Sequence, residues 1–188
     1  MHIILLTHQR ERVKKTNTGQ LVLLQPGLNV TRIIWDRINP DAGLLKRIAK
    51  GDVFLLYPEQ SSSGQDCTRQ NFSDPISSER VAESTVSLEQ GRQDYADEAS
   101  FIIIDSTWQE ARKIFNRSPY LTGLPRITLA PSEGSLFKLR RNQIAGGLCT
   151  AESVIALLKM NHQNHLANKL ETDFYTFVGH VPEKGKND

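Results

Sequence analysis

Short runs of apolar residues recur along the chain, and each run is bounded by polar or turn-forming residues. Apolar runs of three to six residues, rich in Ile, Val and Phe, are typical of strands that are buried on both faces. Such strands occur in parallel sheets that helices cover on each side. The predicted strands lie at residues 3–6, 30–35, 53–57, 101–104 and 127–129.

Segments with helical spacing of apolar residues separate these runs. Because strands and helices alternate along the chain, the predicted fold class is α/β, with a mostly parallel sheet flanked by helices. The predicted helices lie at residues 18–24, 42–50 and 107–117, and one or two amphipathic helices are predicted between residues 150 and 170.

Residues 59–97 differ from the rest because they are mostly polar and open with a Ser-rich stretch. We expect either a polar insertion or a mobile loop there, with a helix near residues 77–91. The tail at residues 182–188 is expected to fray. A chain of 188 residues that is 38% hydrophobic suits one core, so residues 1–188 are interpreted as a single domain.

Composition excludes several classes of protein. The two cysteines, Cys67 and Cys149, are too few for a disulfide framework and belong to no CxxC or Cys/His cluster, so no metal is expected. The first apolar run precedes its charged residues, which is the reverse of a signal peptide. No stretch approaches the roughly 20 apolar residues of a membrane span. These features indicate a cytoplasmic protein with free thiols and no membrane association.

The junction between the strand at 101–104 and the following helix carries the candidate chemistry. Asp105 follows the strand directly, and Thr107 with Glu110 matches the T-x-x-E pattern of a capping box that opens a helix. Trp108 falls on the buried face of that helix, which it shares with Ala111, Ile114 and Phe115, while Lys113 and Arg117 point away from it.

Asp105 therefore stands at the carboxyl edge of the predicted sheet, where ligands bind in open α/β folds. A carboxylate there can act as a general base or can position a substrate. The alternative is that Asp105 only helps to cap the helix, and that Trp108 is a core residue. Spacing by itself favours this alternative.

The segment Asp105-Ser-Thr-Trp108 has the D-x-T-W pattern of the DTW domain family, in which the second position is variable. Further segments match that family in its order, and together they cover roughly residues 3–178. Each segment is weak alone, but the set is specific, so the chain resembles the DTW domain family. The matching segments are Thr16-Asn-Thr-Gly19, Leu56-Tyr-Pro58, Arg117-Ser-Pro-Tyr-Leu121, Gly123-Leu-Pro-Arg126, Leu139-Arg-Arg141 and Leu148-Cys-Thr-Ala-Glu152.

The resemblance implies both a fold and an activity. Proteins of this family are similar to SPOUT-type enzymes, whose sheet carries a trefoil knot near the C-terminus. The family includes transferases of the EC 2.5.1 class that move the 3-amino-3-carboxypropyl group of S-adenosyl-L-methionine to N3 of a tRNA uridine. The resemblance thus implies a tRNA-modifying enzyme with S-adenosyl-L-methionine as cofactor and tRNA as partner, as either a monomer or a dimer.

The same resemblance implies roles for particular residues. Asp105 is expected to assist deprotonation of the uridine N3, and Trp108 is expected to form an apolar wall beside the cofactor or the base. Cofactor contacts are expected from loops at the carboxyl edge, at Leu56, Tyr57, Pro58, Thr107, Leu124, Arg126, Ile127, Leu148, Cys149 and Thr150.

Two of these residues also have simpler interpretations. Thr150 is expected to cap the helix that follows, whose free amides would suit the carboxylate of the cofactor. Cys149 is interpreted as a small buried packing residue rather than as a nucleophile, because the sequence offers it no obvious base.

Basic residues cluster locally although the net charge is only +2. One cluster follows the first predicted strand, and a second lies on the predicted helix at 42–50. A third follows the D-S-T-W segment, and a fourth precedes Leu148. A run of charged residues usually lies on a solvent-exposed face. Clusters that converge on the carboxyl edge of the sheet would instead form a phosphate-binding surface. RNA contacts are expected from Lys15, Asn17, Arg112, Arg117, Arg140 and Arg141.

Two other functions stay open at this point. One is an RNA methyltransferase of the SPOUT type that uses the same cofactor, and the other is a non-catalytic RNA-binding module. Many family members carry a cysteine-rich segment before the first strand, and this sequence begins at that strand. We therefore expect a difference in RNA target, in affinity or in dependence on a partner.

Overall fold

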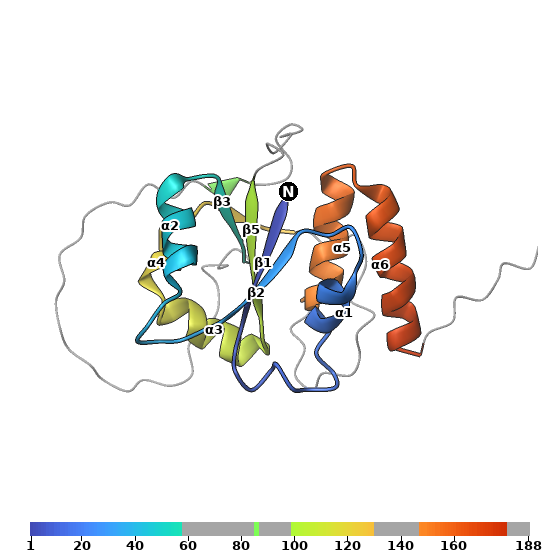
Figure 1. Ribbon diagram of the computed structural model, residues 1–188, viewed down its shortest axis with the longest axis horizontal. Helices are drawn as coiled ribbons and strands as arrows, with labels where there is room; N and C mark the ends of the chain where they lie inside the picture. Colours follow the sequence, from blue (N-terminus) through green and yellow to red (C-terminus); the bar gives the residue numbers. More distant parts are fainter. Residues whose placement is uncertain (58–84, 87–98, 130–146, 180–188) are drawn as a thin grey trace, which may run out of the picture.

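A parallel sheet forms the centre of the protein in the computed structural model, which describes residues 1–57, 85–86, 99–129 and 147–179 (Figure 1). Its six strands run in the order β2-β1-β5-β3-β6-β4, and every neighbouring pair is parallel. This confirms the predicted α/β class. The strands are β1 (His2–Thr7), β2 (Val30–Ile34), β3 (Val53–Leu56), β4 (Thr85–Val86), β5 (Ser100–Asp105) and β6 (Arg126–Ile127).

Helices cover both faces of the sheet (Figure 1). One face carries α1 (Gly19–Leu24), α5 (Thr150–Met160) and α6 (Asn164–Phe177). The other face carries α2 (Ala42–Lys50), α3 (Trp108–Asn116) and α4 (Pro119–Thr122). None of the helices in the described parts of the chain is long and apolar enough to cross a membrane.

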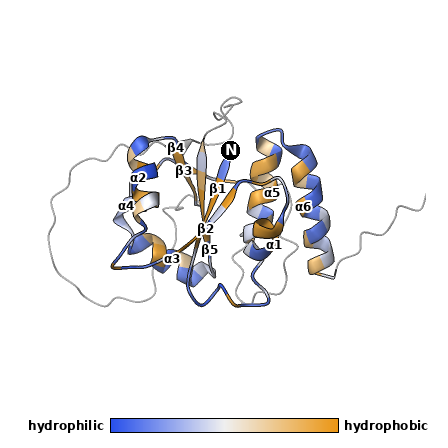
Figure 2. Ribbon diagram, viewed as in Figure 1, coloured by the Kyte–Doolittle hydropathy of each residue, from blue (hydrophilic) through white to orange (hydrophobic). Residues whose placement is uncertain are grey.

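The central strands β1 and β5 are buried along their whole length, as their continuous apolar runs predict. Successive residues of a strand point to opposite faces, so Phe101 and Ile103 enter one core while Ile102 and Ile104 enter the other. Figure 2 shows the same division, with hydrophobic strands between helices whose outer faces are hydrophilic. Asp105 is the last residue of β5 and directly follows these core residues.

The chain leaves β1 and β5 in opposite directions. After β1 it returns through α1 on one face, and after β5 it returns through α3 on the other face. Because β1 and β5 are neighbours, their carboxyl ends form a topological switch point, where open α/β folds bind ligands. The fold thus places Thr7 and Asp105, which pair in register, at the predicted edge.

Most of the predicted elements are confirmed, and one prediction is wrong. The helix predicted near residues 77–91 is contradicted at Thr85–Val86, which form the strand β4 and pair with β6. Both residues are β-branched, and such residues favour extended backbone. The C-terminal helical region consists of two helices, separated at His162, whose backbone has a positive φ of 56°.

Some predictions fall on segments outside the described residues. These are the rest of the polar insertion at 59–97 and the tail at 182–188. The path of residues 130–146, which a knot near the C-terminus would involve, is also outside them. The trefoil knot and the SPOUT likeness therefore stay predictions.

A test of the core packing concerns His2, which begins β1 and is 9% exposed. Its Nε2 lies 2.9 Å from Oγ1 of Thr31. Burial, helped by the positive charge of Arg47, lowers the pKa of His2 below its usual value. The unfolded chain, in which His2 regains a pKa of about 6.5, then binds the proton more readily than the folded protein.

The contribution of His2 to stability is therefore expected to fall as the pH drops through that ordinary value. In urea titrations between pH 8 and pH 5.5, the free energy of unfolding of His2→Gln should decrease less than that of the wild type. The same substitution at exposed His165 is the control. Identical pH dependence in His2→Gln and the wild type would show that His2 is not buried in its neutral form.

Candidate active site

The carboxylate of Asp105 is fully buried and accepts hydrogen bonds from distant parts of the chain. Its Oδ2 accepts from Oγ1 of Thr7 at 3.1 Å and from Nδ2 of Asn17 at 3.0 Å. Its Oδ1 accepts from Oγ1 of Thr150 at 2.9 Å. The guanidinium of Arg32 lies 3.8 Å from Oδ2. One side chain thus connects β1, β2, the segment before α1 and the first residue of α5.

The Thr16–Gly19 segment packs directly on this carboxylate. A Cβ atom at Gly19 would lie 2.6 Å from Oδ2 and 2.7 Å from Oδ1, which is too close for any side chain. The next residue upstream, Thr18, accepts a hydrogen bond at Oγ1 from the amide of Ala151 at 3.4 Å. The T-N-T-G segment therefore packs against both the end of β5 and the start of α5.

The start of α5 differs from the prediction. Thr150 is the first helical residue rather than the N-cap, and its hydroxyl donates to Asp105. Cys149 takes the N-cap position, and its amide donates to the carboxylate of Glu152 at 2.8 Å. Burial raises the pKa of the Cys149 thiol to about 12, so it stays protonated at neutral pH. This agrees with the interpretation of Cys149 as a packing residue.

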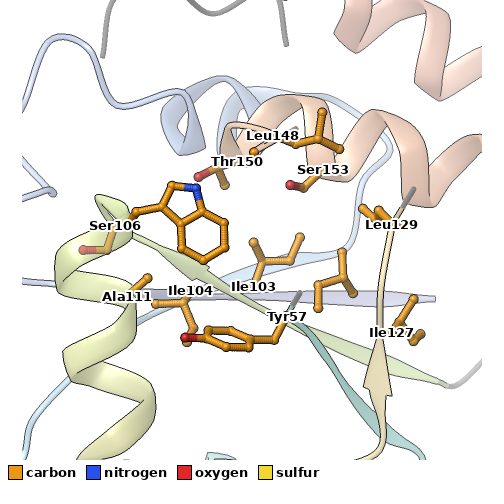
Figure 3. A pocket seen from close by; sticks show the side chains of 13 residues that line it. Tyr57, Ile103, Ile104, Ser106, Ala111, Ile127, Leu129, Leu148, Thr150 and Ser153 are labelled. Carbon is orange, nitrogen blue, oxygen red and sulfur yellow. The ribbon is translucent and has the colours of Figure 1, made fainter. Parts of the chain in front are cut away.

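A pocket of about 740 Å³, which includes open solvent, lies beside this junction (Figure 3). It is bounded by the ends of β3 and β5 and by the first turns of α3 and α5. Most of its lining is aliphatic or aromatic, with Ser106 just after the end of β5 and Thr150 and Ser153 on α5 as small hydroxyl-bearing residues. Asp105 is not among the described residues that line the pocket, and its hydrogen bond with Thr150 connects it to that lining.

Aromatic rings form one wall of the pocket. Tyr57 stacks on Phe115, with ring centroids 4.4 Å apart, and meets Trp108 edge-on at 6.2 Å. The guanidinium of Arg126 lies 5.1 Å from the centroid of the Phe115 ring, on the same cluster. Burial raises the pKa of Tyr57, so its phenol is protonated at neutral pH. The wall is therefore uncharged on the side of Tyr57 and Trp108.

The pocket brings together six of the residues that the sequence indicates for catalysis or for the cofactor. They are Leu56, Tyr57, Trp108, Ile127, Leu148 and Thr150. Several lining residues were not predicted, including Ser106 and Ser153. Ser153 follows Thr150 by three residues, so the helical spacing of the L-C-T-A-E segment carries a signal for it.

Four other residues expected beside the cofactor do not line this pocket. Oγ1 of Thr107 accepts a hydrogen bond from the amide of Glu110 at 3.4 Å, as the first half of the predicted capping box. Leu124 packs against the core, Arg126 lies over Phe115, and Cys149 is buried. Pro58 lies outside the described residues.

In the second half of the predicted capping box, the Glu110 carboxylate would accept from the amide of Thr107. Glu110 makes other contacts instead. The carboxylate of Glu110 bonds to Nζ of Lys113 at 3.2 Å, and it lies 3.7 Å from Nε2 of His8. The contact with Lys113 lies within α3, whereas the contact with His8 joins the first turn of α3 to the residue after β1.

The residues expected to bind RNA divide into two groups. Lys15, Arg112 and Arg117 are exposed, on the segment after β1 and on α3 and its C-cap. Asn17 is a correction: it is 1% exposed, and its amide group bonds to Asp105, so it offers no surface to RNA. Arg140 and Arg141 lie outside the described residues.

The basic cluster on α2 is also a correction, because it does not converge on the site. Arg47, in the last turn of α2, donates from Nη1 to Oγ of Ser100 at 3.3 Å. Ser100 begins β5, whereas the pocket lies where β5 ends. Because α2 leads into the parallel strand β3, its last turn lies at the amino edge of the sheet.

Comparison with known proteins places the chain in a family. A family model of the DTW domain matches residues 1–181, so the chain belongs to the DTW domain family. No solved structure matches the chain. Membership of this family is consistent with a tRNA-modifying enzyme.

The close approach of Gly19 to Asp105 can be tested directly. Alanine usually stabilises a helix relative to glycine, but a methyl group at this position overlaps the carboxylate. We expect Gly19→Ala to destabilise the protein by about 1–3 kcal/mol, as overpacked cores are. Thermal unfolding followed by circular dichroism measures the loss. Gly123→Ala is the control, because a Cβ there meets nothing within 4 Å. A Gly19→Ala protein as stable as the wild type would refute the contact.

Proposed function

We propose that this protein is a tRNA-uridine aminocarboxypropyltransferase, which transfers the 3-amino-3-carboxypropyl group of S-adenosylmethionine to N3 of a tRNA uridine. The observation that carries the proposal is the pocket at the carboxyl edge of the sheet. Its lining combines Trp108 of the D-S-T-W segment with Leu148 and Thr150 of the L-C-T-A-E segment. Family membership supports an RNA substrate.

The pocket suits the chemical groups of S-adenosylmethionine. Its lining is mostly apolar with a few polar groups, as is usual in small-molecule sites. Tyr57 and Trp108 offer aromatic surface for the adenine and for the cationic sulfonium. Ser153, in the first turn of α5, adds a hydroxyl to the lining that suits the polar amino and carboxylate groups of the cofactor.

Selection of the transferred group is a problem of positioning. S-adenosylmethionine supplies three carbons bonded to one sulfonium, and a nucleophile can attack any of them. The pocket must therefore shield the methyl group and leave the aminocarboxypropyl carbon in line with the uridine. Trp108 and Tyr57 are the shielding residues in this proposal, because their rings form one continuous uncharged wall.

Asp105 enters the proposal through Thr150. Its carboxylate is fully buried and is bonded to three side chains, so direct contact with a uridine would require those bonds to open. Exposed Lys15, Arg112 and Arg117 are proposed to bind tRNA phosphates. The proposed activity therefore assigns the cofactor to the pocket and the RNA backbone to the surrounding surface.

The products of the reaction test the proposal. Purified protein is incubated with S-adenosylmethionine and with tRNA from cells that lack this gene, and nucleosides and small molecules are analysed by mass spectrometry. We expect 5′-methylthioadenosine together with an aminocarboxypropyl-uridine nucleoside. S-adenosylhomocysteine with a methylated nucleoside would identify a methyltransferase instead. Neither product, with tRNA binding retained, would identify a binding module.

The two tryptophans of the chain allow a test of the cofactor site. Trp108 lines the pocket, whereas Trp35 bonds through Nε1 to Oγ of Ser118 at 2.9 Å and does not line it. We expect S-adenosylmethionine to change the intrinsic fluorescence in the wild type and in Trp35→Phe, because Trp108 reports binding. Trp108→Phe should lose the change while calorimetry still detects binding. A change that persists in Trp108→Phe and vanishes in Trp35→Phe would place the cofactor elsewhere.

A further inference from the structure

Thr150 connects the pocket with the buried carboxylate of Asp105. Its hydroxyl donates to Oδ1 at 2.9 Å, and the residue lines the pocket together with Ser106 and Ser153 (Figure 3). Among the described residues, Thr150 is the only hydrogen-bond donor to Oδ1. The other carboxylate oxygen, Oδ2, accepts the bonds from Thr7 and Asn17.

We propose that Thr150 is the catalytic residue that accepts the proton from the uridine N3, and that Asp105 receives the hydroxyl proton of Thr150 in the same step. This inference rests on the transfer activity proposed above. It deepens that activity, because it names the group that touches the reacting base and assigns the buried aspartate a role behind it.

The step balances in bonds and charge. The N3–H bond breaks and its proton passes to Oγ1 of Thr150, while the previous hydroxyl proton passes to Oδ1 of Asp105. The electron pair of N3 forms the bond to the aminocarboxypropyl carbon, and the pair of the sulfur–carbon bond stays on sulfur. Neutral 5′-methylthioadenosine leaves, and the protonated carboxyl of Asp105 later returns its proton to solvent along the same path.

The surroundings of Asp105 suit this relay. A threonine hydroxyl is a weak base alone, and a carboxylate bonded to it increases its ability to accept a proton. The bonds from Thr7 and Asn17 hold Oδ2, so the carboxylate keeps Oδ1 directed at Thr150. Gly19 packs against the carboxylate and leaves no room for another side chain. The acceptor is therefore preorganised rather than recruited during the reaction.

Substitutions at Thr150 test the relay by the rate of 5′-methylthioadenosine formation. Thr150→Val has nearly the same shape but no hydroxyl, and we expect its kcat to fall by about 10²-fold or more. The KM for S-adenosylmethionine should change less than kcat, because the hydroxyl that is lost is bonded to Asp105 and acts on the uridine in this proposal. Thr150→Ser keeps the hydroxyl and should retain most of the activity. Thr150→Ala, which only removes atoms, replaces Thr150→Val if the latter does not fold.

Chemical rescue separates proton transfer from a structural role. tRNA transcripts made with 5-fluorouridine carry a more acidic N3, which needs less assistance to lose its proton. We expect fluorination to raise the rate of Thr150→Val by a larger factor than that of the wild type. A defect in folding or in cofactor binding would lower the rate equally with both RNAs.

The possible results are distinguishable. A wild-type protein that forms no 5′-methylthioadenosine would overturn the proposed function, and the relay with it. An active wild type with an equally active Thr150→Val would overturn the relay alone. An inactive Thr150→Val that fluorination does not rescue would likewise overturn the relay, because Thr150 would then act by positioning.

Discussion

The hydrogen bonds of the buried Asp105 carboxylate organise the carboxyl edge of this protein. Burial of a charge costs several kcal/mol unless the charge is paired and hydrogen-bonded, and the guanidinium of Arg32 lies 3.8 Å from this carboxylate. Each hydrogen bond to a charged group offsets about 1.5–3 kcal/mol of that cost. Thr7, Asn17 and Thr150 supply three such bonds from separate parts of the chain. The edge therefore forms as one unit, and the pocket beside it depends on that unit.

The need for hydrogen bonds to the buried Asp105 carboxylate explains why particular residues occur in two of the family segments. In the T-N-T-G segment, Asn17 donates to Asp105, Thr18 binds the first turn of α5, and Gly19 leaves space for the carboxylate. In the L-C-T-A-E segment, Thr150 donates to the same carboxylate, and Glu152 accepts from the amide of Cys149. These segments are distant in sequence but contact each other in the fold, so their residues depend on one another.

Sequence patterns could predict the elements because buried strands leave continuous apolar runs, and because Asp105 follows such a run directly. They could not show which way Asn17 faces, since its bond to Asp105 spans 88 residues. They could not predict that Arg47 lies at the amino edge of the sheet. The spacing of apolar residues along a helix does not indicate which edge of the sheet its last turn reaches. Likewise, the T-x-x-E pattern correctly predicts that Thr107 caps the helix. It gives no indication that Glu110 bonds to Lys113. Local patterns thus locate elements, while long-range contacts decide what each polar residue does.

The burial of Asp105 also has a chemical consequence for the proposed transfer. A carboxylate exposed to the pocket would stand beside an electrophilic carbon of the sulfonium, and would itself be a nucleophile in competition with the uridine. It would also draw water into a site that positions reactants by excluding solvent. Behind Thr150, the carboxylate accepts a proton through a hydroxyl while the pocket wall stays mostly apolar. Under the proposed function, the same burial that fixes the fold at this edge therefore separates the proton acceptor from the alkylating carbon.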